Sequence, residues 1–535
     1  MSIAVIDCLA HGSRGRRLST LDVIGVGPRL IAGILECLGI KYDYFVGSDV
    51  FREPEVLKDF NILLVSGMST DLTSMIRLIR LWGRDGVAIA GGPACVEYEK
   101  LLKSGYDVVV WGEAEDKVSQ VVKEVLTYGK LVSDLPGVFR VEDGKVFGEL
   151  PRKYLSPELL WRYTPSVKVV RRYRGWWAAR VYVEVVRGCS NFYRPTIKLV
   201  SGVVCSGCSS CRSGDLELRI NCPLGIPPGC GYCSVPYLYG PSRSKPVDLV
   251  LNEVRELVKL GVSRVVLSAP DFLDYGRDWL VTPKPLTDPR EPKPNLVAIE
   301  ELLSKLFEIS EIAGGEVYVS IENIKPNLVD RDVAELLSKY LKGTSVGIGL
   351  ETGDNRLHKA LGRPSTVGEV VKAVELLHDY GVKPHIYLIH GLPSEDDLAI
   401  RNTVKIVKKL SKFNIEKFTL YRFTPIKYTA FEGFSKPKPA VKSRTTKKLY
   451  EVVKELNIKL KEGLIGNVVK AVVVGRRGHN LITYPLPHGP VTYVRSSTVS
   501  VGSIVLVRII KVLNDREVLG EVVSVVREGR YRLSP

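Results

Sequence analysis

Residues 187–236 read RGCSNFYRPTIKLVSGVVCSGCSSCRSGDLELRINCPLGIPPGCGYCSVP, and seven of the ten cysteines of the 535-residue chain lie in this stretch. Cysteines at such close spacing form disulfides or bind zinc or iron–sulfur clusters. The chain opens without an apolar signal segment and contains no run of 18 apolar residues, so we expect a cytoplasmic protein with no membrane partner. In that compartment, spaced cysteines more often bind metal than pair as disulfides.

The seven cysteines separate into a group of three and a group of four. The β-branched run Val181–Val186 predicts a strand that ends just before Cys189, and Cys230 and Cys233 form a C-x2-C pair with an aromatic residue between them. The other four suit a closed site, either a second iron–sulfur cluster or zinc: Cys205, Cys208, Cys211 and Cys222. A different division groups Cys222 with Cys230 and Cys233 and needs a strand at Leu216–Ile220, and the sequence leaves both divisions open.

Cys189 and the segment Gly229-Cys-Gly-Tyr-Cys233 resemble the signature of the radical S-adenosylmethionine (radical SAM) superfamily. In that signature a cysteine ends the first barrel strand, and a C-x2-C pair follows. The first gap departs from the pattern, because it is 40 residues long here (190–229) instead of the usual three. The resemblance implies that Cys189, Cys230 and Cys233 hold a [4Fe–4S] cluster whose open iron chelates S-adenosylmethionine. It also implies an electron donor such as ferredoxin or flavodoxin, and a 5′-deoxyadenosyl radical that abstracts hydrogen from an unactivated carbon.

Strand and helix signals alternate from residue 181 to about 435, which predicts a partial (β/α) barrel with its site at the C-terminal ends of the strands. Gly347-Ile-Gly-Leu-Glu-Thr-Gly353 and His390-Gly-Leu-Pro393 follow two predicted strands and resemble superfamily segments that border S-adenosylmethionine. Glycines there let the backbone approach a ligand closely. The resemblance implies that these residues bind the cofactor: Ser320, Glu322, Gly347, Gly349, Glu351, Gly391 and Pro393.

Residues 1–127 also alternate strand-like and helix-like runs, which predicts a doubly wound, Rossmann-like parallel sheet. Ala90-Gly-Gly-Pro93 and Val109–Glu115 resemble two segments of the cobalamin-binding domain that precedes many radical SAM domains. Ala94 stands where that family has a histidine, and no D-x-H-x-x-G motif supplies a lower cobalt ligand. The sequence therefore leaves cobalamin binding open.

Methylthiotransferases offer a rival comparison, because they carry three cluster cysteines in a Rossmann-like N-terminal domain. Cys37, however, falls inside a predicted helix, and the strand end Ser66-Gly-Met-Ser69 has no cysteine where the second ligand is expected. We therefore expect Cys8, Cys37 and Cys95 to be ordinary buried thiols.

Residues 464–535 show short strand-like runs separated by Gly turns and resemble the TRAM domain, a small OB-like barrel attached to RNA-modifying enzymes. A basic helical linker, 436–463, precedes them, and a basic, aromatic linker, 128–180, precedes the radical SAM region. Residues 436–535 hold 19 Lys or Arg against 7 Asp or Glu, a localised excess of cations that favours a nucleic-acid partner. The expected RNA contacts are Lys470, Arg476, Arg477, Arg495 and Arg508.

The expected fold class is α/β: a Rossmann-like N-terminal domain, a partial radical SAM barrel (181–435) with a cysteine-rich insertion, and a small OB-like C-terminal barrel. The function expected from the resemblance is modification of RNA, tRNA above all, by methylthiolation or methylation. Two alternatives stand beside it: a cobalamin-dependent radical methylase of a small molecule or protein, and a non-catalytic RNA-binding metalloprotein. The composition, rich in Lys, Arg, Glu and Val with a single Gln, is typical of a thermophile.

Overall fold

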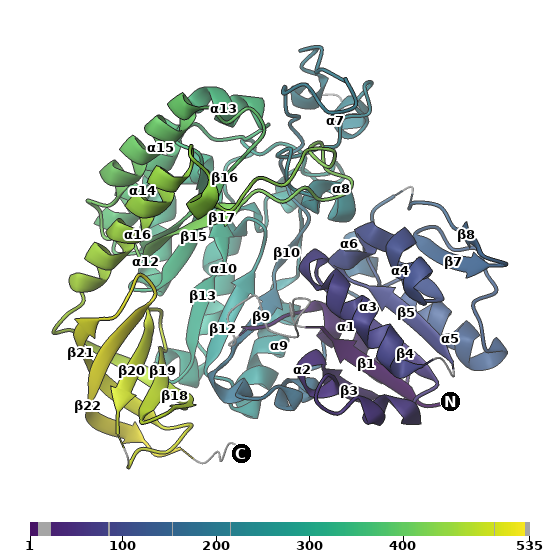
Figure 1. The fold of residues 1–535 in the computed structure, drawn as a ribbon, viewed down its shortest axis with the longest axis horizontal. Coiled ribbons are helices and arrows are strands. Elements are labelled where there is room, and N and C mark those ends of the chain that lie inside the picture. Colours follow the sequence, from purple (N-terminus) through teal and green to yellow (C-terminus); the bar gives the residue numbers. More distant parts are fainter. Residues whose placement is uncertain (9–22, 84–85, 152, 214–215, 497, 530–535) are drawn as a thin grey trace.

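The computed structural model describes residues 1–8, 23–83, 86–151, 153–213, 216–496 and 498–529. Three β-structures follow one another along the chain: an N-terminal sheet, a curved pair of sheets and a small closed barrel (Figure 1). Within the described residues, no helix is long and apolar enough to cross a membrane.

The N-terminal sheet has seven strands in the order β3-β1-β4-β5-β6-β7-β8, and β3 to β6 are parallel. Val5 on β1 packs with helices α1 (Gly27–Cys37) and α5 (Val118–Tyr128), whereas Ile6 packs with α3 (Leu72–Trp82) and α4 (Tyr98–Ser104). Successive strand residues point to opposite faces, so an apolar run needs helices on both sides of the sheet. The strand bounds are β1 Ile3–Asp7, β3 Asp43–Val46, β4 Ile62–Ser66, β5 Val87–Gly91, β6 Val108–Val110, β7 Val138–Glu142 and β8 Lys145–Phe147.

The region expected as a linker, residues 128–180, lies partly inside this sheet. Strand β7 pairs antiparallel with β6, and β8 continues the sheet beyond it. The aromatic side chains of the region also pack inward, with Trp161, Tyr163, Tyr173 and Trp176 all buried. They serve the core and are not available to stack on RNA.

The curved pair of sheets carries the radical SAM region. One sheet has the order β13-β12-β9-β2 and the other β14-β15-β16-β17, with every neighbouring pair parallel. The chain passes from β13 to β14 over Glu322 alone, so the two sheets form one continuous wall. Its strands are β2 Val23–Ile24, β9 Arg180–Glu184, β12 Arg264–Ser268, β13 Tyr318–Ile321, β14 Asn323–Ile324, β15 Ser345–Glu351, β16 Lys383–His390 and β17 Lys417–Arg422.

Helices cover the outer face of this wall: α9 Val247–Leu260, α10 Leu296–Phe307, α12 Arg331–Leu341, α14 Val367–Asp379 and α15 Asp397–Leu410 (Figure 1). Because helices cover only one face of the wall, the residues of strand β16 alternate between half-buried and fully buried along its whole length. The buried set packs on the helices, and the half-buried set faces the interior of the wall, which stays accessible.

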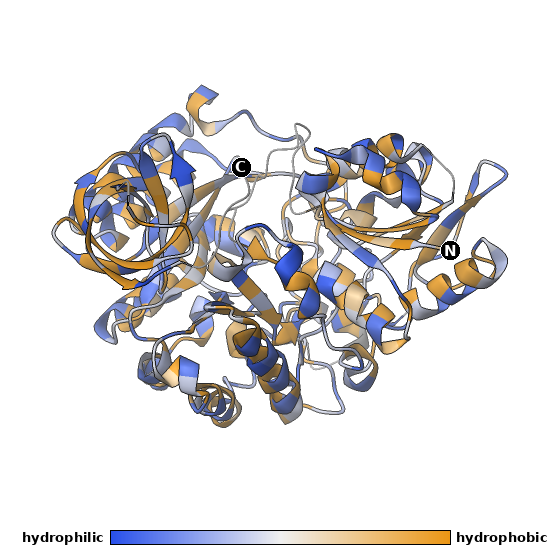
Figure 2. Ribbon diagram, turned by 90° about the horizontal axis from the view of Figure 1, so that it is seen from below, coloured by the Kyte–Doolittle hydropathy of each residue, from blue (hydrophilic) through white to orange (hydrophobic). Residues whose placement is uncertain are grey.

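Residues after 435 form helix α16 (Lys447–Glu462) and a closed five-stranded barrel, β18-β19-β20-β22-β21. Strands β20 and β22 are parallel and the other pairs are antiparallel. Seen from its end, the barrel is a ring of mostly hydrophobic strands (Figure 2). The strand bounds are β18 Val468–Arg477, β19 Asn480–Pro485, β20 Val491–Arg495, β21 Ile504–Val512 and β22 Glu517–Arg527.

Candidate functional site

Cys189, Cys230 and Cys233 come together although 40 residues separate the first from the second. Cys189 follows β10 (Val186–Arg187), and the preceding Gly188 has φ +85°; a Cβ there would lie 2.1 Å from the carbonyl oxygen of Pro241. Asn191 touches two of the thiols, because its backbone N–H donates to Cys189 Sγ (3.4 Å) and its side-chain amide donates to Cys230 Sγ (3.3 Å).

Burial is the main influence on the pKa of two of these thiols, Cys189 and Cys233. It raises the pKa of Cys189 to about 11 and that of Cys233 to about 12, and the neighbouring thiols Cys230 and Cys189 raise the pKa of Cys233 further. Metal binding removes the thiol proton and stabilises the thiolate. Three half-buried thiols beside an amide donor therefore fit a cluster with three protein ligands and one open iron.

The other four cysteines lie in the insertion around Arg194. The buried guanidinium of Arg194 donates to the backbone carbonyls of Ile220 (2.8 Å) and Ile226 (3.2 Å). Burial lowers the pKa of Arg194, and three nearby thiols oppose this effect: Cys211, Cys222 and Cys205. Cys208 is exposed, and hydrogen bonds from Ser210 and Ser206 lower its pKa to about 7. No three Cys, His, Asp or Glu side chains of the described residues approach as ligands of a single ion do.

This arrangement bears on the two ways of dividing the cysteines. The second division needs a strand at Leu216–Ile220, but this segment is helix α7. Cys222 lies with Cys211 and Cys205 at Arg194, whereas Cys189 lies with Cys230 and Cys233. The geometry therefore favours the division into three plus four.

Arg363 connects the cluster loop to the strand ends. Its guanidinium donates to Tyr232 Oη (3.0 Å), to Glu351 Oε1 (3.1 Å) and to the carbonyl oxygen of Gly349. Glu351 ends β15 at a β-bulge with φ +59°, a conformation that non-glycine residues rarely adopt. Burial raises the pKa of Glu351 and the charge of Arg363 lowers it. Arg363 was not among the residues expected from the sequence, although it closely follows the segment Gly347–Gly353 that the sequence singled out.

The glycines of β15 have a role that differs from the expected one. A Cβ at Gly347 would lie 2.3 Å from Asn323 Oδ1, and one at Gly349 would lie 2.3 Å from Glu351 Oε1. At both positions a larger residue would meet side chains of the protein itself and displace them. Nearby, Glu322 accepts a hydrogen bond from Ser268 Oγ (2.7 Å), and burial raises its pKa; Ser320 lies half-buried on β13.

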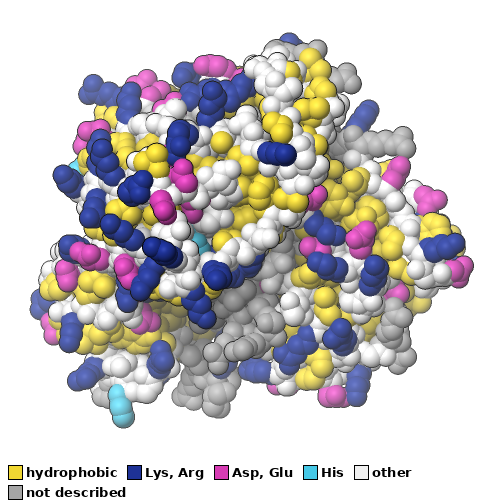
Figure 3. Space-filling model, turned by 45° about the horizontal axis from the view of Figure 1, so that its top comes forward, with side chains coloured by type: hydrophobic (Ala, Val, Ile, Leu, Met, Phe, Trp, Pro, Cys, Tyr) yellow, Lys and Arg dark blue, Asp and Glu magenta, His cyan; other side chains and the backbone are white. Residues whose placement is uncertain are grey.

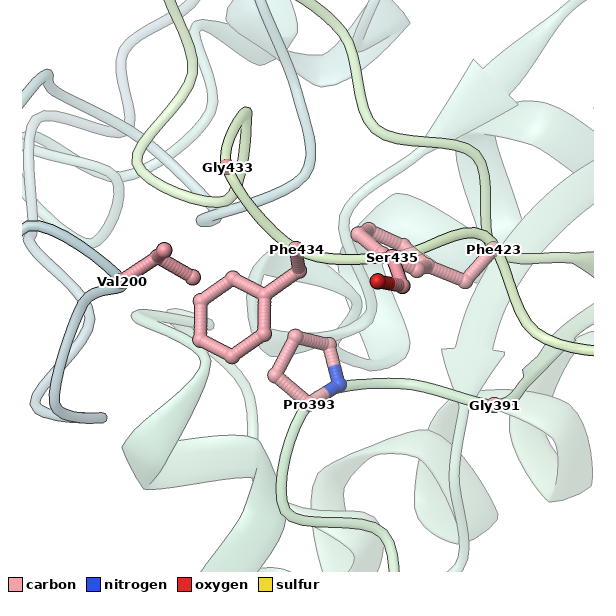
Figure 4. A pocket seen from close by; sticks show the side chains of 7 residues that line it. All are labelled: Val200, Gly391, Pro393, Phe423, Gly433, Phe434 and Ser435. Carbon is pink, nitrogen blue, oxygen red and sulfur yellow. The ribbon is translucent and has the colours of Figure 1, made fainter.

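Gly391 and Pro393 line a pocket of about 410 Å³ at the end of β16. Phe434 lies between Val200 of the insertion and Pro393, so three distant segments meet there (Figure 4). The backbone N–H of Gly391 donates to Glu395 Oε2 (2.6 Å), and burial raises the pKa of Glu395 to about 7. The full lining is Val200, Gly391, Pro393, Phe423, Gly433, Phe434 and Ser435.

A buried charge network that sequence reasoning did not single out lies directly behind Cys189. Lys325 Nζ is 2.9 Å from Ser190 Oγ, 2.9 Å from Asp271 Oδ2 and 2.8 Å from Asp274 Oδ2, and Arg277 pairs with Asp274. The side chains of both aspartates are fully buried. The only sequence signal was the placement of Asp271 and Asp274 just after the second barrel strand.

The N-terminal domain meets the barrel through the segment that resembles a cobalamin-binding motif. Glu113 pairs with Arg243 (2.6 Å) and Glu115 pairs with Arg187. Beyond β6, the buried Trp111 ring lies 4.5 Å from the ring of Tyr428, a residue of the segment after β17. The rings of Trp111 and Tyr428 therefore pack against each other just beyond the strand end that carries this motif.

The N-terminal cysteines agree with expectation at two positions of three. Cys8 and Cys95 are buried, but Cys37 is exposed, which corrects the expectation for this residue. Cys37 is the last residue of α1 and is in phase with the buried residues Leu30 and Ile34, so its exposure belongs to the end of the helix and not to a solvent-facing side.

The cations expected to bind RNA divide between two ends of the C-terminal barrel. Arg477 and Arg495 are both in register with Asn480 on the strand between them, and Arg476 is beside them; all three arginines are exposed. Lys470 instead donates to the carbonyl oxygen of Gly315 (3.2 Å) in the radical SAM region, a correction to its expected role. Arg508 pairs with Glu521 (3.1 Å).

Comparison with known proteins agrees with this architecture. Residues 220–407 match the Radical SAM superfamily. An uncharacterized protein of Methanopyrus kandleri is 38% identical over 98% of this chain and 97% of its own length. A tRNA-2-methylthio-N(6)-dimethylallyladenosine synthase of Thermotoga petrophila is 25% identical, covering 74% of this chain and 71% of that protein.

A solved structure with a similar fold is the radical S-adenosylmethionine methyltransferase TsrM from Kitasatospora setae, which was determined with cobalamin and a [4Fe-4S] cluster bound. It superposes with a TM-score of 0.56 at 13% identity, over 81% of this chain and 74% of that one. The matched region, the parallel wall and the three cysteines at its first strand end together assign the chain: it belongs to the radical SAM superfamily, in one family with the uncharacterized protein of Methanopyrus kandleri.

Proposed function

We propose that this protein is an RNA-modifying radical SAM enzyme, and that Cys189, Cys230 and Cys233 hold its catalytic [4Fe–4S] cluster. The observation that carries the proposal is the convergence of these three thiols with Arg363 and Glu351 at the strand ends. When bound, such a cluster chelates S-adenosylmethionine and passes one electron to it, which yields methionine and a 5′-deoxyadenosyl radical that takes a hydrogen atom from substrate. The electron comes from a one-electron donor of the ferredoxin or flavodoxin class.

The protein's own residues orient and enclose the reactants in this proposal. Arg363 holds Glu351 toward a ribose hydroxyl, and Ser320 and Glu322 face the amino end of the cofactor. Gly391 and Pro393 border the adenine beside the 410 Å³ pocket. The phenol of Tyr232, held by Arg363, ties the cluster loop to these contacts. Cys205, Cys208, Cys211 and Cys222 are proposed as ligands of a second metal centre, an iron–sulfur cluster or zinc, although no three of them approach as ligands of one ion do in this structure; Arg194 would be its counter-charge.

Two features support RNA as the substrate. The exposed arginines 476, 477 and 495 gather at one end of a TRAM-like barrel, and the relative from Thermotoga petrophila is named for a modification of tRNA. The reaction proposed is therefore methylthiolation or methylation of tRNA. Cobalamin is left out of the proposal, because Trp111, in the segment that resembles the cobalamin motif, already packs against Tyr428 beyond β6.

Anaerobic reconstitution with iron and sulfide, followed by S-adenosylmethionine and dithionite, tests the catalytic claim. Wild-type protein should form 5′-deoxyadenosine, and Cys189→Ala, Cys230→Ala and Cys233→Ala should each abolish it, whereas the exposed-thiol control Cys37→Ala should not. If Cys189→Ala still formed 5′-deoxyadenosine and Cys222→Ala did not, Cys222 and not Cys189 would be the third ligand of the catalytic cluster. Nucleoside mass spectrometry of tRNA from a deletion strain tests the substrate, and an unchanged profile would leave the RNA claim without support.

A further inference from the structure

A second pocket, of about 370 Å³, lies beside the first on the outer side of the barrel wall. It is formed where β16 and β17 end and α16 begins, with Tyr450 of α16 on one side and His390 and Arg422 on the other. Its size is within the range of pockets for small organic groups, which begins at about 300 Å³. The lining is His390, Leu420, Arg422, Pro439, Ala440, Val441 and Tyr450.

Arg422 lines this pocket, and Lys436 lies in the chain between Ser435 of the first pocket and Pro439 of the second. Among the residues that the structure describes, no carboxylate lies within ion-pair distance of Arg422 or Lys436. Burial lowers the pKa of Lys436, and the positive charge of Arg422 lowers it further. Neighbouring like charges without a counter-ion repel each other and are stabilised by a bound anion. The last strands of (β/α) barrels are also a frequent place for phosphate.

His390 gives a second, independent observation. It is 3% exposed, lines the pocket, and its Nδ1 has no hydrogen-bond partner in the described structure. A buried polar atom without a partner costs stability unless a ligand or water satisfies it. The same pocket therefore offers cations for a phosphate and a polar ring nitrogen deeper inside.

The rest of the lining favours an aromatic ligand. Tyr450 is 37% exposed and Val441 is 48% exposed, which leaves a ring face and an apolar wall open to solvent. Exposed Lys438, Lys442 and Arg444 continue the positive surface along the same segment. Lys and Arg side chains also gather over the neighbouring barrel helices (Figure 3). Such an extended cationic surface suits a chain of phosphates better than a single free nucleotide.

We propose that this pocket holds one unpaired nucleotide of an RNA substrate, with its phosphate on Arg422 and Lys436 and its base against Tyr450. The inference rests on the proposed RNA substrate and names a contact outside the C-terminal barrel. It places the RNA at the rim of the same wall whose strand ends carry Glu351 and Gly391.

Fluorescence anisotropy of the full-length reconstituted protein tests the assignment, with a labelled 12-nucleotide single-stranded RNA as the probe. Tyr450→Leu should weaken binding by about 5- to 150-fold, the range for loss of one base stack. Arg422→Ala should weaken it and lower the slope of log affinity against log salt by about 0.7, the value for one phosphate of a single strand. The matched control Lys372→Ala removes an exposed lysine on α14 and should change affinity less than twofold.

The results distinguish a failure of the pocket assignment from a failure of the proposed RNA substrate. Variants at Arg422 and Tyr450 that bind like Lys372→Ala, while keeping wild-type iron content and melting temperature, would overturn the pocket and leave the RNA substrate standing. Wild-type protein that binds no RNA would remove the proposed substrate itself. A duplex of the same sequence that shows the same Tyr450→Leu loss would exclude base stacking, and free UMP that displaces the probe at equal concentration would assign the pocket to a mononucleotide.

Discussion

Replacing Lys325 by Met should destabilise the radical SAM region strongly. The ammonium lies 2.8–2.9 Å from Asp271, Asp274 and Ser190, and both carboxylates are fully buried. Removing one partner of a buried ion pair typically costs about 3–5 kcal/mol, because a buried charge is left uncompensated. For a domain of this size each kcal/mol shifts the melting temperature by about 2–4 °C, so we expect a fall of about 6–20 °C.

Differential scanning calorimetry of the reconstituted full-length protein measures this effect, and two variants control it. Lys339→Met removes a lysine of similar reach that pairs with Glu300 at 2.6 Å on the surface, and exposed pairs contribute about 0–1 kcal/mol. Adding Asp271→Asn to Lys325→Met removes the excess negative charge and should recover part of the loss. Burial and the charge of Asp274 already raise the pKa of Asp271, so the folded variant binds a proton more readily than the unfolded chain, and its deficit should be smaller at pH 5 than at pH 8.

The reasoning would be refuted if Lys325→Met melted within about 2 °C of Lys339→Met, or if the double variant were less stable than the single one. Either result would mean that the network at Cys189 is relaxed by water or by movement of the loop.

Burial raises the pKa of Glu395 from 4.5 to about 7 in the folded protein. Between these pH values the folded wild type binds more protons than the unfolded chain, so its free energy of unfolding should fall by about 3 kcal/mol as pH rises from 4.5 to 7. Glu395→Gln removes this titration and should flatten the pH dependence of stability. Denaturant melts at several pH values measure this, and parallel curves for the two proteins would contradict it. Glu253→Gln should lower the free energy of unfolding by about 3–5 kcal/mol, because Arg29 (2.8 Å) and Lys245 (2.7 Å) stay buried without the carboxylate that they share. The control Glu256→Gln, in an exposed ion pair, should lower it by less than about 1 kcal/mol. Equal melting temperatures for the two variants would contradict this prediction. Arg363→Lys should weaken S-adenosylmethionine binding to the reconstituted protein at least tenfold in equilibrium dialysis, since an ammonium cannot span Tyr232 and Glu351 together, and unchanged affinity would exclude this bridge. Hydroxocobalamin titrated against the protein should produce no saturable change in absorbance, because Trp111 and Tyr428 already pack against each other beyond β6; a stoichiometric end point would show otherwise.

Much of the architecture could be predicted, because strands and helices follow from patterns among residues that are neighbours in the sequence. Strand and helix periodicity depends on which neighbours in sequence share a face, and it indicated the alternating strands and helices of residues 181–435 and the all-β character of residues 464–535. The cysteine spacing likewise pointed to two groups, because ligands of one centre tend to be supplied by one loop. Local pattern was misleading where it was short: Leu216–Ile220 has apolar residues at alternate positions, yet it forms a helix.

Side-chain partners were decided by the tertiary structure alone. Arg363 meets Tyr232, and Lys325 meets Asp271 and Asp274, only because the wall curves and brings strand ends from different segments to one place. The contact of Lys470 with the radical SAM region and the exposure of Cys37 were likewise visible only in the folded structure. Sequence alone determined the residue types, their periodicity and the cysteine spacing, whereas long-range packing decided which charges are buried together, because a pairing across 50 or more residues leaves no mark in the local pattern of either partner.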